Sequence, residues 1–301
     1  MTDNGRNSQA SPRPGSARFF HRREAKYEVG VGAATFLREE IARRLPRFEY
    51  EKGHPTTYIT TVYFDTESHD LYRRAERHYD QNLKIRVKEY YYPLGAGPDA
   101  KDDYKVCSYC YVEIKEHSNG SVVKKRFRFP KRDLSRLMRG EDLLPLLAET
   151  TPPEEIGRLG EVYGEFRRLL GLHPVRATSI VTYRRAVYQE SEDTLRVTFD
   201  DHFAVWAPLP GLYDIHPALT PEVLKKPVRV TDKVILEIKG PGDFPDWLEK
   251  ALRYHSTKRL SKFTTSVRLL LGGEDPAANS RVLGSRNGSD GDTKTLTEEF
   301  H

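Results

Sequence analysis

Cysteines and long apolar runs are both scarce in this sequence. Its 301 residues include only Cys107 and Cys110, which excludes a disulfide framework, and a single C-x-x-C without a second pair gives little support for a zinc site. No run of about 18 apolar residues occurs, and no apolar stretch follows a basic N-terminal start. We therefore expect two unrelated thiols in a reducing cytoplasmic setting, with neither a membrane span nor a secretory signal.

Two common nucleotide-binding motifs are also missing. The sequence has no Gly-x-x-x-x-Gly-Lys-Ser/Thr phosphate loop and no three-glycine dinucleotide fingerprint. Charge, in contrast, is plentiful: 49 Lys and Arg stand against 44 Asp and Glu, which gives a formal net charge of +5. This mildly basic balance suits a polyanionic partner but does not identify one.

Charged and apolar residues alternate in several segments. Successive side chains of a strand point to opposite faces. Residues 83–90 therefore place Lys84, Arg86 and Lys88 on one face and aliphatic side chains on the other, and residues 195–200 repeat the pattern. These segments are predicted to be strands that are apolar on one side and charged on the other.

A Glu-x-Lys unit occurs at 24–26, 113–115 and 237–239, and in a strand both of its charged ends share one face. One interpretation is an antiparallel sheet with a solvated face, on which charges of both signs are ordinary. The other is a barrel with a charged lumen, which would need fixed carboxylates and an anionic ligand, because each unpaired buried ion costs several kcal/mol. Alternation alone does not choose between them.

The remaining pattern predicts one α+β, mainly β domain. Strands are predicted at 22–29, 57–65, 82–92, 104–117, 122–129, 175–189, 194–200 and 233–239. Helices are predicted at 33–45, 131–139, 154–170, 246–254 and 263–271, with a polar, partly helical connection at 67–77 and an irregular excursion at 202–230. Together they predict an eight-stranded antiparallel barrel, closed or nearly closed, with flanking helices.

Turn and tail signals complete the outline. Ser118-Asn119-Gly120 is typical of a tight hairpin turn, since Asn-Gly tolerates positive φ angles. Residues 1–18 and 272–301 are rich in Gly, Ser and Asn and are predicted to be disordered, which leaves 19–271 as the domain.

An ordered set of motifs spans residues 20–271. In chain order these are Arg22-x-Glu24-x-Lys26-Tyr27, Thr61-Val62-Tyr63-Phe64-Asp65, Arg86-x-Lys88-x-Tyr90, Glu113-x-Lys115-x-His117, Tyr183-Arg184-Arg185, Arg196-x-x-x-Asp200, Glu237-x-Lys239 and Leu260-Ser261-Lys262-Phe263. The set resembles the catalytic domain of the vacuolar transporter chaperone (VTC) family of polyphosphate polymerases. That family belongs to the triphosphate tunnel metalloenzymes, with the CYTH-type triphosphatases and class IV adenylyl cyclases.

The resemblance implies a fold, a reaction and a set of site residues. The fold is an eight-stranded antiparallel tunnel, and the reaction adds the γ-phosphoryl group of ATP to a growing polyphosphate chain with release of ADP, using Mn²⁺ or Mg²⁺. Catalytic basic positions fall on Lys26, Arg86, Lys88, Lys115, Arg185, Arg196 and Lys262. The metal-binding acid falls on Glu237, with Glu24 and Glu113 as helpers or as salt-bridge partners. Further substrate contacts fall on Arg74, Arg77, Lys239, Arg259 and His117.

Several positions depart from the family pattern or have a structural alternative. Lys88 stands where relatives carry an arginine, so a point charge replaces a bidentate phosphate contact. Ala75 holds the place of another arginine, for which Arg74 or Arg77 substitutes, and Arg259 replaces a lysine. His117 has a structural alternative, because a lone histidine is more often a hydrogen-bonded wall residue than an acid or base. The alternating cations at 124–128 suit either a tunnel lining or a solvated edge.

Other functions remain open at this stage. A triphosphate hydrolase on the same tunnel differs only in using water as the acceptor. A polyphosphate-binding module without turnover has less need of a metal ligand such as Glu237. Nucleic acid is not expected, because the charged strands lack the interleaved aromatics of stacking platforms. Without a membrane span, translocation of the product would require a separate membrane protein.

Overall fold

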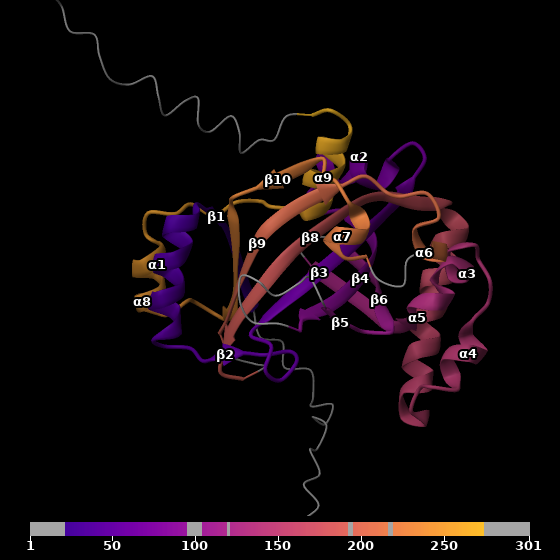
Figure 1. The fold of residues 1–301 in the computed structure, drawn as a ribbon, viewed down its shortest axis with the longest axis horizontal. Helices are drawn as coiled ribbons and strands as arrows, with labels where there is room; N and C mark the ends of the chain where they lie inside the picture. Colours follow the sequence, from indigo (N-terminus) through magenta and orange to yellow (C-terminus); the bar gives the residue numbers. More distant parts are fainter. Residues whose placement is uncertain (1–21, 95–103, 119–120, 192–194, 216–218, 274–301) are drawn as a thin grey trace, which may run out of the picture.

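One curved antiparallel sheet organises the molecule (Figure 1). The computed structural model describes residues 22–94, 104–118, 121–191, 195–215 and 219–273. Eight strands follow the hydrogen-bonded order β1-β11-β9-β8-β3-β4-β6-β7. Their bounds are β1 Arg22–Val29, β3 Thr56–Thr66, β4 Asn82–Pro93, β6 Tyr109–Ser118, β7 Ser121–Pro130, β8 Val175–Gln189, β9 Arg196–Trp206 and β11 Val234–Pro241. The short strands β2 (Arg47–Phe48), β5 (Tyr104–Val106) and β10 (Arg229–Thr231) pair with β8, β4 and β9.

The sheet curls around a channel without closing by hydrogen bonds. In the described ranges β1 and β7 end the strand order and do not pair with each other, yet Glu24 of β1 and Lys124 of β7 line the same cavity. The free edge of β1 is instead taken by residues after the helix that follows β11. Tyr27 bridges to Thr257, and the Lys258 amide donates to the Lys26 carbonyl at 2.8 Å. The mainly β, eight-stranded tunnel is confirmed, in its open form.

Helices flank the curved sheet (Figure 1), and one of them, α9 (Lys262–Leu270), reaches the channel through Lys262 and Phe263. Helices α1 (Val31–Ala42) and α8 (Asp246–Leu252) pack together on the β1 side. The long helix α5 (Pro153–Leu172) packs on β7, accompanied by α3 (Leu134–Met138) and α4 (Leu144–Ala148). The remaining helices are α2 (Asp70–Arg77), α6 (Leu212–Ile215) and α7 (Pro221–Leu224), with a 3₁₀ turn at Lys131–Asp133. No helix in the described ranges is both long and apolar enough to cross a bilayer.

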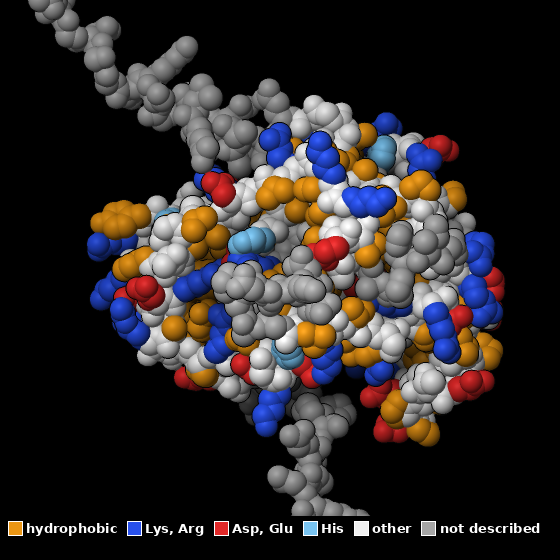
Figure 2. Space-filling model, viewed as in Figure 1, with side chains coloured by type: hydrophobic (Ala, Val, Ile, Leu, Met, Phe, Trp, Pro, Cys, Tyr) orange, Lys and Arg blue, Asp and Glu red, His pale blue; other side chains and the backbone are white. Residues whose placement is uncertain are grey.

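The apolar sides of the strands form the core against these helices, as the alternation predicts. Ile85 and Val87 are buried in one cluster with Phe127 and Phe166, and a second cluster joins α1, α8 and the β1–β11 side of the sheet. Apolar burial on one side leaves the charged sides of the same strands facing the channel. The space-filling view in Figure 2 shows basic, acidic and apolar side chains intermixed over the visible surface.

Some local predictions differ from the structure. The strand predicted at 104–117 is interrupted, giving β5 and β6, and β9 continues to Trp206 into the predicted excursion, which also contains α6, α7 and β10. The helix predicted at 154–170 extends to Leu172 as α5, and no helix was predicted where α4 lies. The turn residues Asn119 and Gly120, the predicted arm and all of the predicted tail after Gly273 lie outside the described residues.

Candidate functional site

The concave face of the sheet holds two adjoining cavities, of about 390 and 250 Å³. Both are lined by Lys88, Lys124, Arg185, Glu237 and Lys239, so we treat them as one channel. Its basic lining comprises Lys26, Lys84, Arg86, Lys88, Lys115, Lys124, Arg126, Arg185, Arg196, Lys239 and Lys262. Among the described lining residues the only carboxylates are Glu24, Glu51 and Glu237. The channel is therefore strongly cationic.

Strand register brings like charges side by side in this lining. Lys84 of β4 lies opposite Lys115 of β6, which lies opposite Lys124 of β7. We call these three residues the lysine row. Directly opposed like charges destabilise a sheet. Burial, and then Lys115 and Arg86, lower the pKa of Lys84 to about 7. The channel therefore has more positive charge than its own carboxylates neutralise.

The same crowding acts on the other lysines of the row. Burial, followed by Lys26 and Arg86, lowers the pKa of Lys115 to about 8. For Lys124, burial lowers the pKa by more than the nearby Glu113 carboxylate raises it. An anion placed along the row would favour the charged form of each ammonium.

Glu113 is a fully buried anchor beside the lysine row. Its carboxylate is 2.7 Å from Arg86 Nη2 and 2.8 Å from Lys124 Nζ, and Arg86 Nε also donates to it at 2.7 Å. Burial alone would raise the pKa of Glu113, but Arg86, Lys88 and Lys124 hold it well below its usual range. Because this carboxylate is fully buried and cations contact both of its oxygens, the arrangement fits the salt-bridge alternative rather than a metal ligand.

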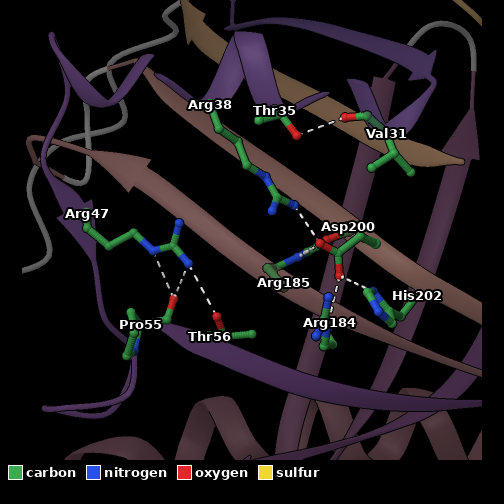
Figure 3. A network of polar contacts seen from close by, with 11 residues as sticks. Val31, Thr35, Arg38, Arg47, Pro55, Thr56, Arg184, Arg185, Asp200 and His202 are labelled. Carbon is green, nitrogen blue, oxygen red and sulfur yellow. Dashed lines mark hydrogen bonds and ion pairs between the residues drawn. The ribbon is translucent and has the colours of Figure 1, made fainter. Parts of the chain in front are cut away.

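Asp200 plays a matching part on the other wall. This fully buried carboxylate receives Arg185 through two bonds of 2.7 Å and Lys262 at 2.8 Å. Figure 3 shows Arg185 beside Asp200. Arg38 and Arg184 instead contact the next residue, which points to the opposite, outer face of the strand. There Asp201 accepts from Arg184 at 2.9 Å and from Arg38 of α1 at 2.6 Å. Adjacent residues thus build one ion cluster inside the channel and one outside.

Glu24 and Glu237 come together across β1 and β11. The ammonium of Lys239 lies 2.9 Å from Glu237 and 3.2 Å from Glu24, and Lys26 lies 2.8 Å from Glu24. Burial would raise the pKa of Glu237, but Lys239 and Lys26 hold it well below its usual range. Two carboxylates that already hold a cation between them offer the oxygen donors that Mg²⁺ and Mn²⁺ prefer.

This pair fits a divalent cation that is shared with a ligand. In the described part of the chain, no group of three or more His, Cys, Asp or Glu residues forms a complete metal centre. Mg²⁺ commonly uses one or two protein carboxylates and takes its other ligands from water and substrate phosphates. Glu237, supported by Glu24, therefore suits a metal bound together with a phosphate ligand.

Four of the predicted substrate contacts lie outside the described channel lining. Arg74 and Arg77 are on α2, where Arg74 Nε donates to the Gln81 carbonyl at 3.0 Å. Arg259 lines a separate cavity of about 350 Å³, near α9 and β10. His117 is held neutral, because burial and then Lys115 and Lys84 lower its pKa to about 4. The structure does not bring these four into the channel, and their roles remain predictions.

Conversely, the channel includes residues that the predicted site omits. Lys84 was placed on the charged face without a role, and its Nζ donates to Ser261 Oγ at 3.2 Å. Lys124 lines both cavities, so this residue belongs to the channel lining rather than to a solvated sheet edge. Asp200 is part of the Arg196-x-x-x-Asp200 motif but is not among the predicted site residues, and it binds Arg185. The alternation of cations at 124–128 was the sequence signal for Lys124. No sequence signal indicated that Asp200 would pair with Arg185 and Lys262.

A curved antiparallel sheet around a cation-lined channel defines the class of this protein. The family model described as the VTC domain matches residues 21–271, so the chain belongs to the VTC domain family. The resemblance seen in the sequence motifs is thereby confirmed. Among curated proteins, none matches the chain.

Several solved structures are similar to this chain at low identity. A putative adenylate cyclase from Bacillus halodurans has 10% identity and a TM-score of 0.36, over 72% of this chain and 79% of that chain. A Pyrococcus horikoshii protein has 10% identity and a TM-score of 0.37, over 83% of this chain and 99% of its own. A putative adenylate cyclase from Vibrio parahaemolyticus has 10% identity and a TM-score of 0.35, over 84% and 98%.

Proposed function

We propose that this protein is a metal-dependent polyphosphate polymerase that transfers the γ-phosphoryl group of ATP to a growing polyphosphate chain and releases ADP. The observation that carries the proposal is the cation excess of the channel, above all the lysine row of Lys84, Lys115 and Lys124. A linear polyanion would relieve the repulsion among these groups along their whole length. A triphosphate group and a polyphosphate chain both have this form.

Two arginines would grip the transferring phosphates. Glu113 fixes Arg86 and Asp200 fixes Arg185, so each guanidinium is oriented before any ligand arrives. The nitrogens that the carboxylates do not engage can donate to phosphate oxygens in the planar geometry that arginine favours. Donors held in place in this way need little reorganisation when charge shifts during phosphoryl transfer.

The metal would be held by Glu237 with Glu24 as its neighbour. A bound Mn²⁺ or Mg²⁺ supplies positive charge that phosphate oxygens share. The protein contributes the two carboxylates, and Lys26 and Lys239 beside them supply further positive charge to the same region.

The reaction itself needs no nucleophile from the protein. A terminal oxygen of the acceptor chain attacks the γ-phosphorus of ATP, the bond to the bridging β-γ oxygen breaks, and ADP leaves with that oxygen. The cations hold the two chains in line and neutralise charge on the leaving diphosphate. A hydrolase would perform the same displacement with water.

The test is to incubate the protein with ATP and Mn²⁺ and to resolve ADP, free phosphate and chains longer than triphosphate. Arg185→Gln removes a channel cation, whereas its neighbour Arg184→Gln removes one from the outer face and serves as the matched control. Long chains with ADP that are lost only in Arg185→Gln support the polymerase. Free phosphate alone indicates the hydrolase, and binding of tripolyphosphate without turnover indicates a binding module.

A further inference from the structure

The two ends of the channel carry different side chains. The larger cavity is lined by Tyr50, Tyr90, Tyr92, Tyr109 and Tyr111, which we call the tyrosine mouth. None of these five lines the smaller cavity, which contains Lys84 and Lys115 of the lysine row, whereas Lys124 lines both cavities. The cations shared by both cavities connect the two ends. Both cavities are cationic, and the smaller one has its own aromatic residues in Tyr63, Tyr183 and Phe263, but the cluster of five tyrosines lies only at the larger end.

The tyrosines on β4 and β6 are held in a fixed edge-to-face arrangement. The ring of Tyr111 lies 5.7 Å from Tyr90 and 5.8 Å from Tyr109, with interplanar angles of 85° and 86°. The guanidinium of Arg126 lies 4.7 Å over the Tyr111 ring, and that of Arg128 lies 3.7 Å over Tyr109. Such contacts restrict the rings, so little side-chain freedom is left to lose when a ligand stacks on them.

Tyr50 lies on the opposite wall of the same cavity. Its hydroxyl accepts a hydrogen bond from Arg196 Nη2, and Arg196 belongs to β9. Tyr50 itself follows β2 (Arg47–Phe48), and β9 is separated from β6 in the sheet order by β8, β3 and β4, so Tyr50 borders the cavity from a segment distant from Tyr109 and Tyr111. Tyr50 is 41% exposed, and its ring lies 5.3 Å from the Phe48 ring in an edge-to-face arrangement.

A ligand made only of phosphate gains little from these rings. Aromatic faces carry partial negative charge, so the rings themselves do not attract phosphate, although Arg126 and Arg128, which stack on Tyr111 and Tyr109, keep their positive charge. A planar, neutral group gains stacking on every ring that it reaches. The volume of about 390 Å³ is within the range of small-molecule pockets.

We propose that the tyrosine mouth is a nucleoside subsite. It would take the base of a nucleoside triphosphate, whose phosphates pass Lys88 and Arg185 and extend toward the lysine row. The inference rests on the proposed function, since it assumes that the channel holds a triphosphate. It adds a direction, with the base at the tyrosine end and the terminal phosphate toward Lys84 and Lys115.

The test compares ATP with tripolyphosphate, which has the phosphates but no nucleoside. Isothermal calorimetry with Mg²⁺ gives both dissociation constants for the full chain and for Tyr111→Ala, Tyr111→Phe and Tyr50→Ala. Tyr254, which is 81% exposed with Arg253 4.6 Å over its ring, lines neither channel cavity and provides the matched control Tyr254→Ala.

We expect the alanine variants in the mouth to weaken ATP binding about 5- to 100-fold, the usual loss when a stacking aromatic is removed. Tripolyphosphate binding should change less than about twofold, which also reports an intact channel. Tyr111→Phe keeps the ring and should resemble the wild type, as should Tyr254→Ala.

Three results would overturn the nucleoside subsite. Equal weakening of ATP and tripolyphosphate would make the tyrosines part of the channel wall only, and unchanged ATP binding in both alanine variants would place the nucleoside elsewhere. Loss of ATP binding in Tyr111→Phe would assign the effect to the hydroxyl. These outcomes leave the proposed function standing, whereas failure of the wild type to bind either ligand would overturn both.

Discussion

Glu113 and Glu237 occupy the same motif and have different surroundings. Each is the acid of a Glu-x-Lys unit on a channel strand. Glu113 has no exposed surface and is 2.7 Å from Arg86 and 2.8 Å from Lys124, whereas the Glu237 side chain is 14% exposed and shares Lys239 with Glu24. Neighbouring strands, rather than the motif, therefore decide how each carboxylate is buried and paired.

Neutralising Glu113 should have the largest effect, and on stability. Glu113→Gln leaves the largely buried Arg86 beside a neutral amide, together with Lys124, which is 40% exposed. Breaking a buried pair in this way costs about 3–5 kcal/mol, so we expect urea unfolding to show a loss of that size in the free energy of unfolding. The matched variant Glu237→Gln should lose less, because its partners reach solvent. Equal losses would remove the distinction between the two carboxylates.

Neutralising Glu237 should instead affect turnover. We expect Glu237→Gln to keep a native circular dichroism spectrum and to lower Mn²⁺-dependent ATP turnover by at least about 10- to 100-fold, the range seen when metal sites are disturbed. Glu237→Asp, which keeps a carboxylate, should retain part of the activity at raised Mn²⁺. Undiminished turnover in Glu237→Gln would exclude this residue as the metal ligand.

Local periodicity was sufficient to predict the faces of the strands. Lys84, Arg86 and Lys88 face the channel and their aliphatic neighbours face the core, because a two-residue period is a property of each strand alone. Helices and strands with strong patterns were also found, and β8 has the predicted bounds.

What local pattern could not predict depends on contacts between distant segments. The pairing of Asp200 with Lys262 requires α9 to dock at the channel, and the role of Lys124 requires the register of β6 with β7. The order of the motifs predicts a substrate contact at Arg74. This residue is on α2, and no residue of α2 belongs to the described channel lining. The sheet stays open because Thr257 and the residue after it take the edge of β1.

Removing Lys84 should separate ligand binding from stability. We expect Lys84→Met to weaken tripolyphosphate binding about tenfold at pH 6, since hydrogen bonds to charged groups contribute about 1.5–3 kcal/mol. The same variant should raise the free energy of unfolding of the ligand-free protein, because it removes repulsion from Lys115 and Arg86. Arg38→Met, on the outer face, should instead destabilise the protein by leaving Asp201 with fewer partners. A destabilised Lys84→Met variant would contradict an excess of charge in the channel.

The increase in the free energy of unfolding of Lys84→Met should also depend on pH in a defined direction. The pKa of Lys84 in the folded, ligand-free protein is about 7, below the unfolded lysine value of about 10.4. The unfolded chain therefore binds this proton more tightly, and the resulting destabilisation is complete below about pH 7 and disappears as the pH approaches 10.4. The difference in unfolding free energy between wild type and variant should shrink over that range.

Proton uptake on ligand binding is the smallest expected effect and the most direct sign of an anion in the lysine row. At pH 7.5 and above most ionisable oxygens of tripolyphosphate are deprotonated, and saturating Mg²⁺ in the titration favours ionisation of the last one. Lys84, with a pKa of about 7, and Lys115, with one of about 8, are then partly neutral, and a bound anion favours their protonation. Affinity should fall about two- to fivefold between pH 7.5 and 8.5. Calorimetry in buffers of different ionisation enthalpy should show net uptake, and uptake unchanged in Lys84→Met would mean that the protons bind elsewhere.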